Sequence, residues 1–261
     1  TLFPYTTLFR SRSKELQQLL KGIRGDPKVV KAVERLNAGY GTYKEVNTIA
    51  LQVGKRIADE MSITFDAEAL ARYLSAGHEI VTLSAEVAQM NLNSAAGIAV
   101  KPMVTKTPKY KIEQTVAKIA AVEPEVVPTM CENVLPSFML EMVDDITKYN
   151  ADFQKDSGMH PIIRRTWSGS YPSHDTRHTD NCEELAGEWE YGDEPRETYF
   201  RHEGCRCTVE YFPNKSAEGQ ITALAKYEVA RNGELGAKEE TLAYRERRAA
   251  FNKAFDKKRK K

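Results

Sequence analysis

The sequence predicts an α+β protein with a mainly helical N-terminal domain, a small β-rich module containing cysteine and histidine, and a basic helical tail. Apolar residues recur at three- and four-residue intervals through the N-terminal half, which is the spacing of a buried helix face. The composition changes at Ser157, and the segment from there to Pro213 holds both tryptophans, four of the five histidines and three of the four cysteines. We therefore expect four regions, at residues 1–11, 12–156, 157–215 and 216–261.

Two capping signals mark the beginnings of helices in the N-terminal half. Asp26 followed by Pro27 is typical of an N-cap and a first helical turn, and Gly39 is placed to end that helix. Thr42 and Glu45 have the spacing of a capping box. Apolar stripes accompany both signals, and we expect them to be core rather than cofactor sites. The stripes comprise Leu16, Leu19, Leu20, Ile23, Val29, Val30, Val33, Leu36, Val46, Ile49, Ala50, Val53 and Ile57.

Further helices are predicted up to residue 153. The pattern predicts two helices, at 65–74 and 79–92, with Gly77 between them, followed by an extended connector at 95–102. Helical spacing returns at 112–121, and Pro124 and Pro128 indicate a loop after it. An amphipathic helix is then expected at 138–153, with Met139, Met142, Val143, Ile146 and Tyr149 on its apolar side.

Short strands distinguish the region after Ser157. Residues 161–165 are compatible with a strand, and residues 208–212 alternate between apolar and polar as a half-buried strand does. After Pro213 the helical pattern returns, at 221–230 and at 239–255. The β-rich module is therefore expected to lie between two helical regions.

Composition and charge limit the classes of function. The chain is 29% charged and 41% hydrophobic with a net charge of +1, so the whole molecule has no strong attraction to polyanions. No apolar run approaches the roughly 20 residues that cross a bilayer. Residues 245–261 hold nine basic and two acidic residues, which indicates either nonspecific DNA contact or a solvated helix end. The DNA-contacting candidates are Lys257, Lys258, Arg259, Lys260 and Lys261.

The first eleven residues need a separate interpretation. Residues 1–11 resemble the translation of a common sequencing adapter, and we expect an artefact of sequence assembly there, the alternative being a disordered natural leader. Nothing in this segment has the order of a signal peptide, so reduced cysteines are expected, which favours metal ligands over disulfides.

A cluster of metal-binding residue types stands out near position 205. His202, Cys205 and Cys207 fall within six positions, and Cys182 lies about twenty residues earlier. Zinc prefers thiolate and imidazole ligands in a tetrahedron, so these four residues are a candidate structural zinc site that would stabilise a small module. Two alternatives remain: buried core thiols with a structural histidine, or a disulfide or redox role in which Cys182 is the better partner for Cys205 or Cys207.

Three passages run in order over residues 40 to 212, and the block from Arg201 to Tyr211 is the most specific of them. The passages are 40–47 with 49–51, then 93–102, and finally 143–145, 150–154, Gly158, 161–164, Cys182, 185–187 and 201–211. Together they resemble the minor head protein family of tailed bacteriophages related to protein F of phage Mu, in the form common in phages of Firmicutes.

This resemblance implies a structural role without catalysis. It implies a protein of the virion head, assembled in the bacterial host cytoplasm, that acts in head morphogenesis near the portal. Its implied partners are the portal, scaffold and major capsid proteins, together with packaged DNA contacted nonspecifically, and no membrane. The chain departs from the family where C-x-x-C often precedes L-A-G, because Thr179 replaces the first cysteine. His178 is a candidate extra ligand in its place.

The rival interpretation is an enzyme. His174, His178 and Asp180 form an H-x-x-x-H pattern with a carboxylate, which could serve a metal-dependent nuclease or hydrolase. The general-base glutamate of H-E-x-x-H is missing, and Pro172 favours a loop there. Glu188 and Glu190 match the paired glutamates of ADP-ribosyltransferases, but no other part of such a site is visible.

Overall fold

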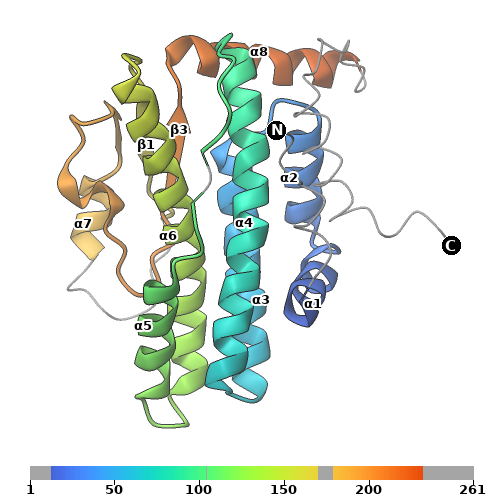
Figure 1. Ribbon diagram of the computed structural model, residues 1–261, viewed down its shortest axis with the longest axis vertical. Coiled ribbons are helices and arrows are strands. Elements are labelled where there is room, and N and C mark those ends of the chain that lie inside the picture. The colour runs from blue at the N-terminus through green and yellow to red at the C-terminus, as the bar shows by residue number, and fades with distance from the viewer. Residues whose placement is uncertain (1–12, 104, 170–178, 232–261) are drawn as a thin grey trace, which may run out of the picture.

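A computed structural model describes residues 13–103, 105–169 and 179–231. It confirms the α+β class, with long helices and one small antiparallel sheet. Figure 1 shows the order of elements along the chain. The elements are α1 (Lys14–Ile23), α2 (Pro27–Asn37), α3 (Tyr43–Ile63), α4 (Ala67–Ala95), α5 (Lys109–Ala120), α6 (Val127–Asp156), β1 (Ile162–Thr166), α7 (Thr179–Glu184), β2 (Gly187–Glu190), the 3₁₀ turn η2 (Arg196–Tyr199), β3 (Thr208–Phe212) and α8 (Lys215–Arg231).

The three longest helices, α3, α4 and α6, lie side by side and form the centre of the molecule (Figure 1). Helices α1 and α2 pack against α3 and α4 on one side, and α5 packs against α4 and α6. Helix α8 crosses one end of the bundle and contacts α4. None of the helices that the structure describes is both long and apolar enough to span a bilayer.

The capping signals form as predicted. The Asp26 side chain accepts hydrogen bonds from the backbone N–H groups of Lys28 and Val29, at 2.7 and 3.3 Å. Thr42 and Glu45 complete a capping box at the start of α3, where the Glu45 carboxylate accepts from the Thr42 N–H at 2.8 Å. These bonds satisfy donors that the first turn of a helix cannot pair internally, and so they fix where α2 and α3 begin.

Two glycines serve close packing between helices. The expected break at Gly77 is wrong, because α4 runs unbroken from Ala67 to Ala95. A Cβ at Gly77 would lie 2.8 Å from the Met139 sulfur, so this glycine makes room for α6. Gly54 of α3 does the same more tightly, because its Cβ would lie 2.5 Å from the Pro136 Cα. A glycine inside a helix therefore marks a close approach here rather than an end.

Helix α6 also differs from its prediction. It begins at Val127 rather than near residue 138, with Pro128 in its first turn, where a proline is tolerated. The expected loop at Pro128 is therefore wrong. Pro136 lies inside the helix. Tyr149, expected on the apolar side, is 43% exposed, while Met139 is completely buried.

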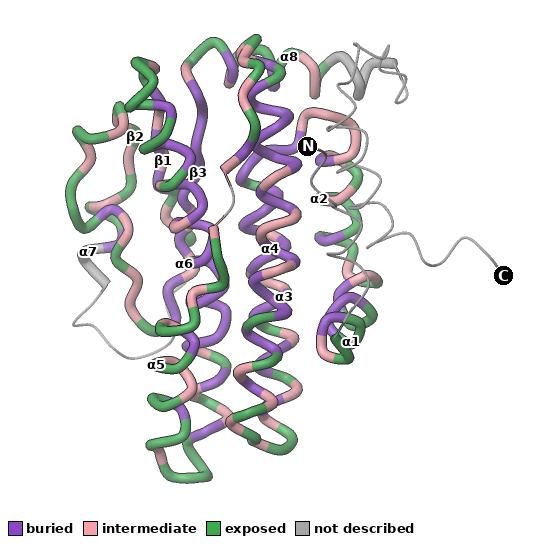
Figure 2. The backbone as a smooth tube through the Cα atoms, in the orientation of Figure 1, coloured by how far each residue is buried: buried purple, intermediate pink, exposed green. Residues whose placement is uncertain are grey.

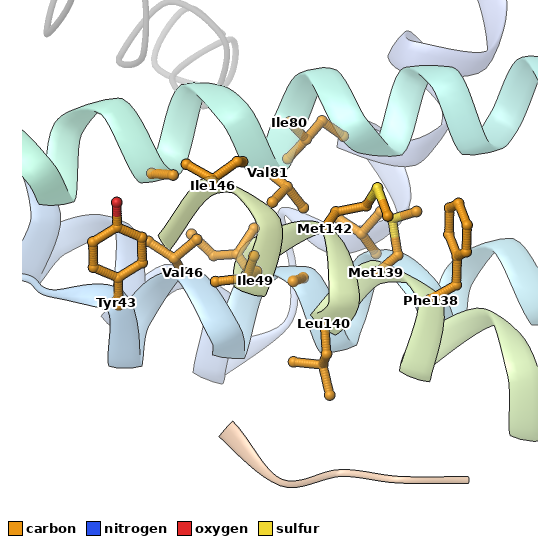
Figure 3. Packing of buried hydrophobic residues seen from close by; sticks show 14 of the residues in the cluster. Tyr43, Val46, Ile49, Ile80, Val81, Phe138, Met139, Leu140, Met142 and Ile146 are labelled. Carbon is orange, nitrogen blue, oxygen red and sulfur yellow. The ribbon is translucent and has the colours of Figure 1, made fainter. Parts of the chain in front are cut away.

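The core lies where α3, α4 and α6 face one another (Figures 2 and 3). Met139, Met142 and Ile146 of α6 lie among Val46 and Ile49 of α3 and Ile80 and Val81 of α4. Leu140 points to the other side of α6, away from α4 (Figure 3). All of these side chains are at most 2% exposed. The apolar stripes at helical spacing are thus mostly core, as predicted, although Val30 is 41% exposed.

The sheet has the order β2-β1-β3 and both pairs are antiparallel. The strands expected at 161–165 and 208–212 are confirmed as β1 and β3, whereas β2 was not predicted. Ile163, Val209 and Tyr211 belong to the same hydrophobic cluster as the helices. The Tyr211 ring packs edge-on against Tyr43 of α3, and the Asn47 side chain donates to the Val209 carbonyl at 2.9 Å. The sheet is therefore anchored directly on the bundle.

Candidate metal centre

Three cysteine sulfurs meet beside the sheet. Cys182 comes from α7, and Cys205 and Cys207 come from the segment that leads into β3. Their sulfurs all lie within 4.8 Å of one another, and the residues are 4%, 1% and 1% exposed. None of the four cysteines is disulfide-bonded. Residues separated by more than twenty positions thus place three soft ligands at one buried point.

His202 joins the cluster through one ring nitrogen. Its Nε2 lies 3.1 Å from the Cys182 sulfur, and its Nδ1 lies 2.7 Å from the Glu203 carbonyl oxygen. Because a carbonyl only accepts, we assign the proton to Nδ1, which leaves the Nε2 lone pair for the cluster. Metal-binding histidines commonly use this arrangement, in which a second hydrogen bond fixes the tautomer and the ring. The structure thus brings the three predicted cysteines together and places His202 against one of them, Cys182.

The loop that carries these residues is fastened to α6. Gly204 has a φ of 76°, a left-handed conformation that glycine adopts without strain, and its N–H donates to the Asn133 carbonyl at 3.1 Å. The Ser137 hydroxyl donates to the Cys205 carbonyl at 3.0 Å, and Arg206 donates to the Glu132 carbonyl at 2.8 Å. These bonds hold the backbone between His202 and Cys207 against α6.

Two buried arginines surround the sulfurs. Arg165 of β1 is 2% exposed, and its guanidinium lies 3.7 Å from the Cys182 sulfur and 3.9 Å from the Cys205 sulfur. Arg201 lies 3.8 Å from the Cys205 sulfur and donates to the Cys207 carbonyl at 2.7 Å. Arg201 also forms a two-bond ion pair with the buried Asp144 of α6, at 2.6 and 2.8 Å.

The thiols differ in their ease of ionisation. A hydrogen bond from the Cys205 thiol lowers the pKa of Cys207 to about 7, against the effect of burial and with a smaller contribution from Arg165. That same bond and burial raise the pKa of Cys205. Burial raises the pKa of Cys182. Burial also raises the pKa of Asp144, although Arg201 opposes the effect. Of the three clustered thiols, Cys207 is the one whose pKa is lowered.

The donor set fits zinc. Three thiols and one imidazole form one of the common structural zinc sets, and a tetrahedral ion with bonds of about 2.3 Å separates its sulfurs by about 3.8 Å. The three sulfurs already lie within 4.8 Å, so small side-chain movements suffice.

Other predicted sites fall outside this cluster. Residues 1–11, His174, His178 and the basic residues 257–261 lie outside the described residues, as does the side chain of Asp180. Glu188 pairs with Arg164 at 2.9 Å, and Glu190 lies 2.6 Å from His160. Glu188 thus contacts the neighbouring strand β1, and Glu190 contacts a residue just before that strand.

Comparison of the chain with protein-family models, with curated proteins and with solved structures finds no match. The site therefore has to be interpreted from its own geometry.

The sequence interpretation missed the charged residues of the site, namely Arg165, Arg201 and Asp144. One signal could have found Arg165, because it lies two positions after Ile163 in a strand and therefore on the same buried face. Asp144 carried no such signal, since a single acidic residue in an amphipathic helix is usually solvated.

Proposed function

We propose that this chain is a structural protein whose Cys182, His202, Cys205 and Cys207 hold a zinc ion. The observation that carries this proposal is the meeting of three buried sulfurs within 4.8 Å, with the His202 Nε2 3.1 Å from one of them. Zinc at such a site is a redox-inert crosslink. It would join α7 to the loop before β3, and through that loop to α6.

We further propose that the protein is a non-enzymatic minor head protein of a tailed bacteriophage that acts in head morphogenesis near the portal. The resemblance of residues 40–212 to that family supports the proposal. Residues in the resembling passages make specific contacts: Asn93 accepts from Gln154 at 3.1 Å, Asn150 donates to the Met103 carbonyl at 3.2 Å, and Asp144 pairs with Arg201. On this proposal the helical bundle supplies contacts with the portal, scaffold and major capsid proteins.

Elemental analysis of purified, tag-free protein tests the metal centre. We expect about one zinc ion per chain. Cys205→Ser should lose the metal, whereas Cys131→Ala should keep it, because Cys131 is equally buried but lies outside the sulfur cluster. A wild-type protein that folds fully and contains no metal after expression with added zinc would overturn this part of the proposal.

The genomic position of the gene and a binding assay test the role in the head. We expect a portal gene immediately upstream, with scaffold and major capsid genes downstream. The protein should also co-purify with that portal protein when the two are co-expressed. Neighbouring genes of unrelated metabolism, together with a portal protein that does not bind, would overturn the proposal.

Contact with packaged DNA is proposed for residues 245–261, which carry a strong excess of basic residues. Deletion of this segment should weaken binding to duplex DNA and flatten its dependence on salt, because each neutralised phosphate releases counterions. Affinities measured at two salt concentrations, with and without the segment, decide the point. An affinity that the deletion leaves unchanged would reject DNA contact and leave the metal centre unaffected.

A further inference from the structure

The buried Arg165 has an unusual set of partners. One of its terminal nitrogens donates to the carbonyls of Thr198 and Phe200, the latter at 3.2 Å. The other faces the sulfurs of Cys182 and Cys205, at 3.7 and 3.9 Å. Within the described part of the chain, no carboxylate lies within ion-pair distance of Arg165. Its charged end therefore faces neutral carbonyls and thiols.

Among the side chains that the structure describes, the buried charges beside the sulfurs leave one positive charge unbalanced. Burial raises the pKa of Asp144 and the charge of Arg165 opposes that shift, but both carboxylate oxygens of Asp144 already accept hydrogen bonds from Arg201. Two guanidinium groups therefore share one carboxylate. An unpaired buried charge is costly, so the fold needs one more negative charge beside Arg165.

A zinc ion bound by three thiolates and a neutral imidazole supplies that charge. Three thiolates and one divalent cation leave a single net negative charge, and Arg165 would balance it. We propose that Arg165 is the counter-ion of an anionic complex between a metal ion and the three thiolates. Its positive charge thereby favours a divalent, thiol-preferring cation bound by three cysteines and one histidine. This inference rests on the proposed metal centre and adds a specificity-determining residue that is not itself a ligand.

Two substitutions of Arg165 separate the effect of its charge from the effect of its shape. Arg165→Lys keeps the positive charge and loses the planar group, whereas Arg165→Gln keeps an amide donor and loses the charge. Arg164→Gln is the matched control, because Arg164 is the adjacent strand residue and pairs instead with Glu188 and Glu218 on the outer face. Changes outside the ligand shell typically alter metal affinity by about 10- to 100-fold.

The test is competition for zinc between a chromogenic chelator and the full-length protein, with Co²⁺ absorption spectra to check that the ligand set is unchanged. We expect Arg165→Gln to lose about 10- to 100-fold in zinc affinity. Arg165→Lys should lose clearly less, and Arg164→Gln should match the wild type. Equal losses in the Lys and Gln variants would overturn the counter-ion role, because hydrogen-bond geometry alone would then explain them.

A second measurement keeps the test decisive if Arg165→Gln fails to fold. Cys182→His gives a complex with one fewer negative charge, so it should weaken binding strongly when Arg165 is present and much less in the double variant that also carries Arg165→Gln. If the double variant cannot be measured, Arg165→Lys decides: loss of zinc binding by that variant would reject the charge role. A wild-type protein that binds neither zinc nor cobalt would instead reject the metal centre itself.

Discussion

The Arg206 guanidinium donates a 2.8 Å hydrogen bond to the main-chain carbonyl of Glu132. In a regular helix that carbonyl would accept from the N–H of residue 136, but Pro136 has none. The loop from Arg201 to Cys207 therefore supplies the donor that the proline removes from α6. The next carbonyl, of Asn133, accepts from Gly204, which lies in the same loop. The irregular point of the helix and the cysteine loop thus stabilise each other.

Arg206→Met should lower the free energy of unfolding by about 0.5–1 kcal/mol, since it removes the donor to the Glu132 carbonyl at an exposed position, where water replaces part of the lost bond. In a Pro136→Ala background the loss should be smaller, because the introduced alanine provides a helical N–H for the same carbonyl. Urea denaturation of the four proteins in this double-mutant cycle measures the difference. The same loss in both backgrounds would show that the two residues are not coupled.

Gly54→Ala should destabilise the fold by about 1–3 kcal/mol, because the added methyl group would meet backbone atoms of Leu135 and Pro136 at 2.5–2.9 Å. Gly219→Ala in α8 is the matched control, since nothing lies within 4 Å of its added methyl group. Alanine favours helix over glycine, so the control should gain about 0.5–1 kcal/mol. Thermal unfolding of both variants should show shifts of opposite sign, and a stable Gly54→Ala protein would contradict the close approach of α3 and α6.

His78 should make the fold sensitive to acid. Burial lowers its pKa from 6.5 to about 4, although Asp145 opposes the shift. Between those values the unfolded chain binds a proton that the folded chain does not, so stability falls as the pH drops from 6.5 to 4 and this contribution levels off below 4. The loss is on the order of 3 kcal/mol at most.

The measurement is the free energy of unfolding against pH for the wild type and for His78→Gln, which has no titrating group at this position. The difference between the two curves isolates His78 from the carboxylates that titrate in the same range. Parallel curves from pH 6.5 to 4 would mean that the pKa of His78 is the same in the folded and unfolded states.

Removal of metal should loosen one side of the molecule and leave the other folded. Binding energy at a structural zinc site is folding energy, so chelation should lower the melting temperature. We expect hydrogen exchange to quicken in α7, in the loop from Arg201 to Cys207 and in β2. The centres of α3 and α4 should stay protected, because their core is independent of the sulfurs. Exchange that quickens uniformly through the bundle would instead show that the metal centre and the core unfold as one unit.

Local chemistry made much of the fold predictable. The caps at Asp26 and Thr42 act within three residues of themselves, so the sequence sufficed to place the starts of α2 and α3. The alternation at 208–212 likewise predicted β3. The predictions of a helix break at Gly77 and a loop at Pro128 were wrong because they depended on more than local chemistry. The effect of a glycine or proline depends on what packs against it and on where in a helix it falls, and neither is a local property.

The sequence by itself determined the α+β class, the core stripes, and the four cysteine and histidine residues that could bind a soft metal. Only the tertiary structure decided that the three cysteines meet and that His202 lies against Cys182, since Cys182 and Cys205 approach through the packing of β1, α7 and the loop on α6. It also added the charges that the sequence did not reveal, because the roles of Arg165, Arg201 and Asp144 depend on burial. A charged side chain is ordinarily solvated, and its sequence position does not show otherwise. Once the fold excludes it from water, the presence or absence of an oppositely charged partner determines its effect on stability.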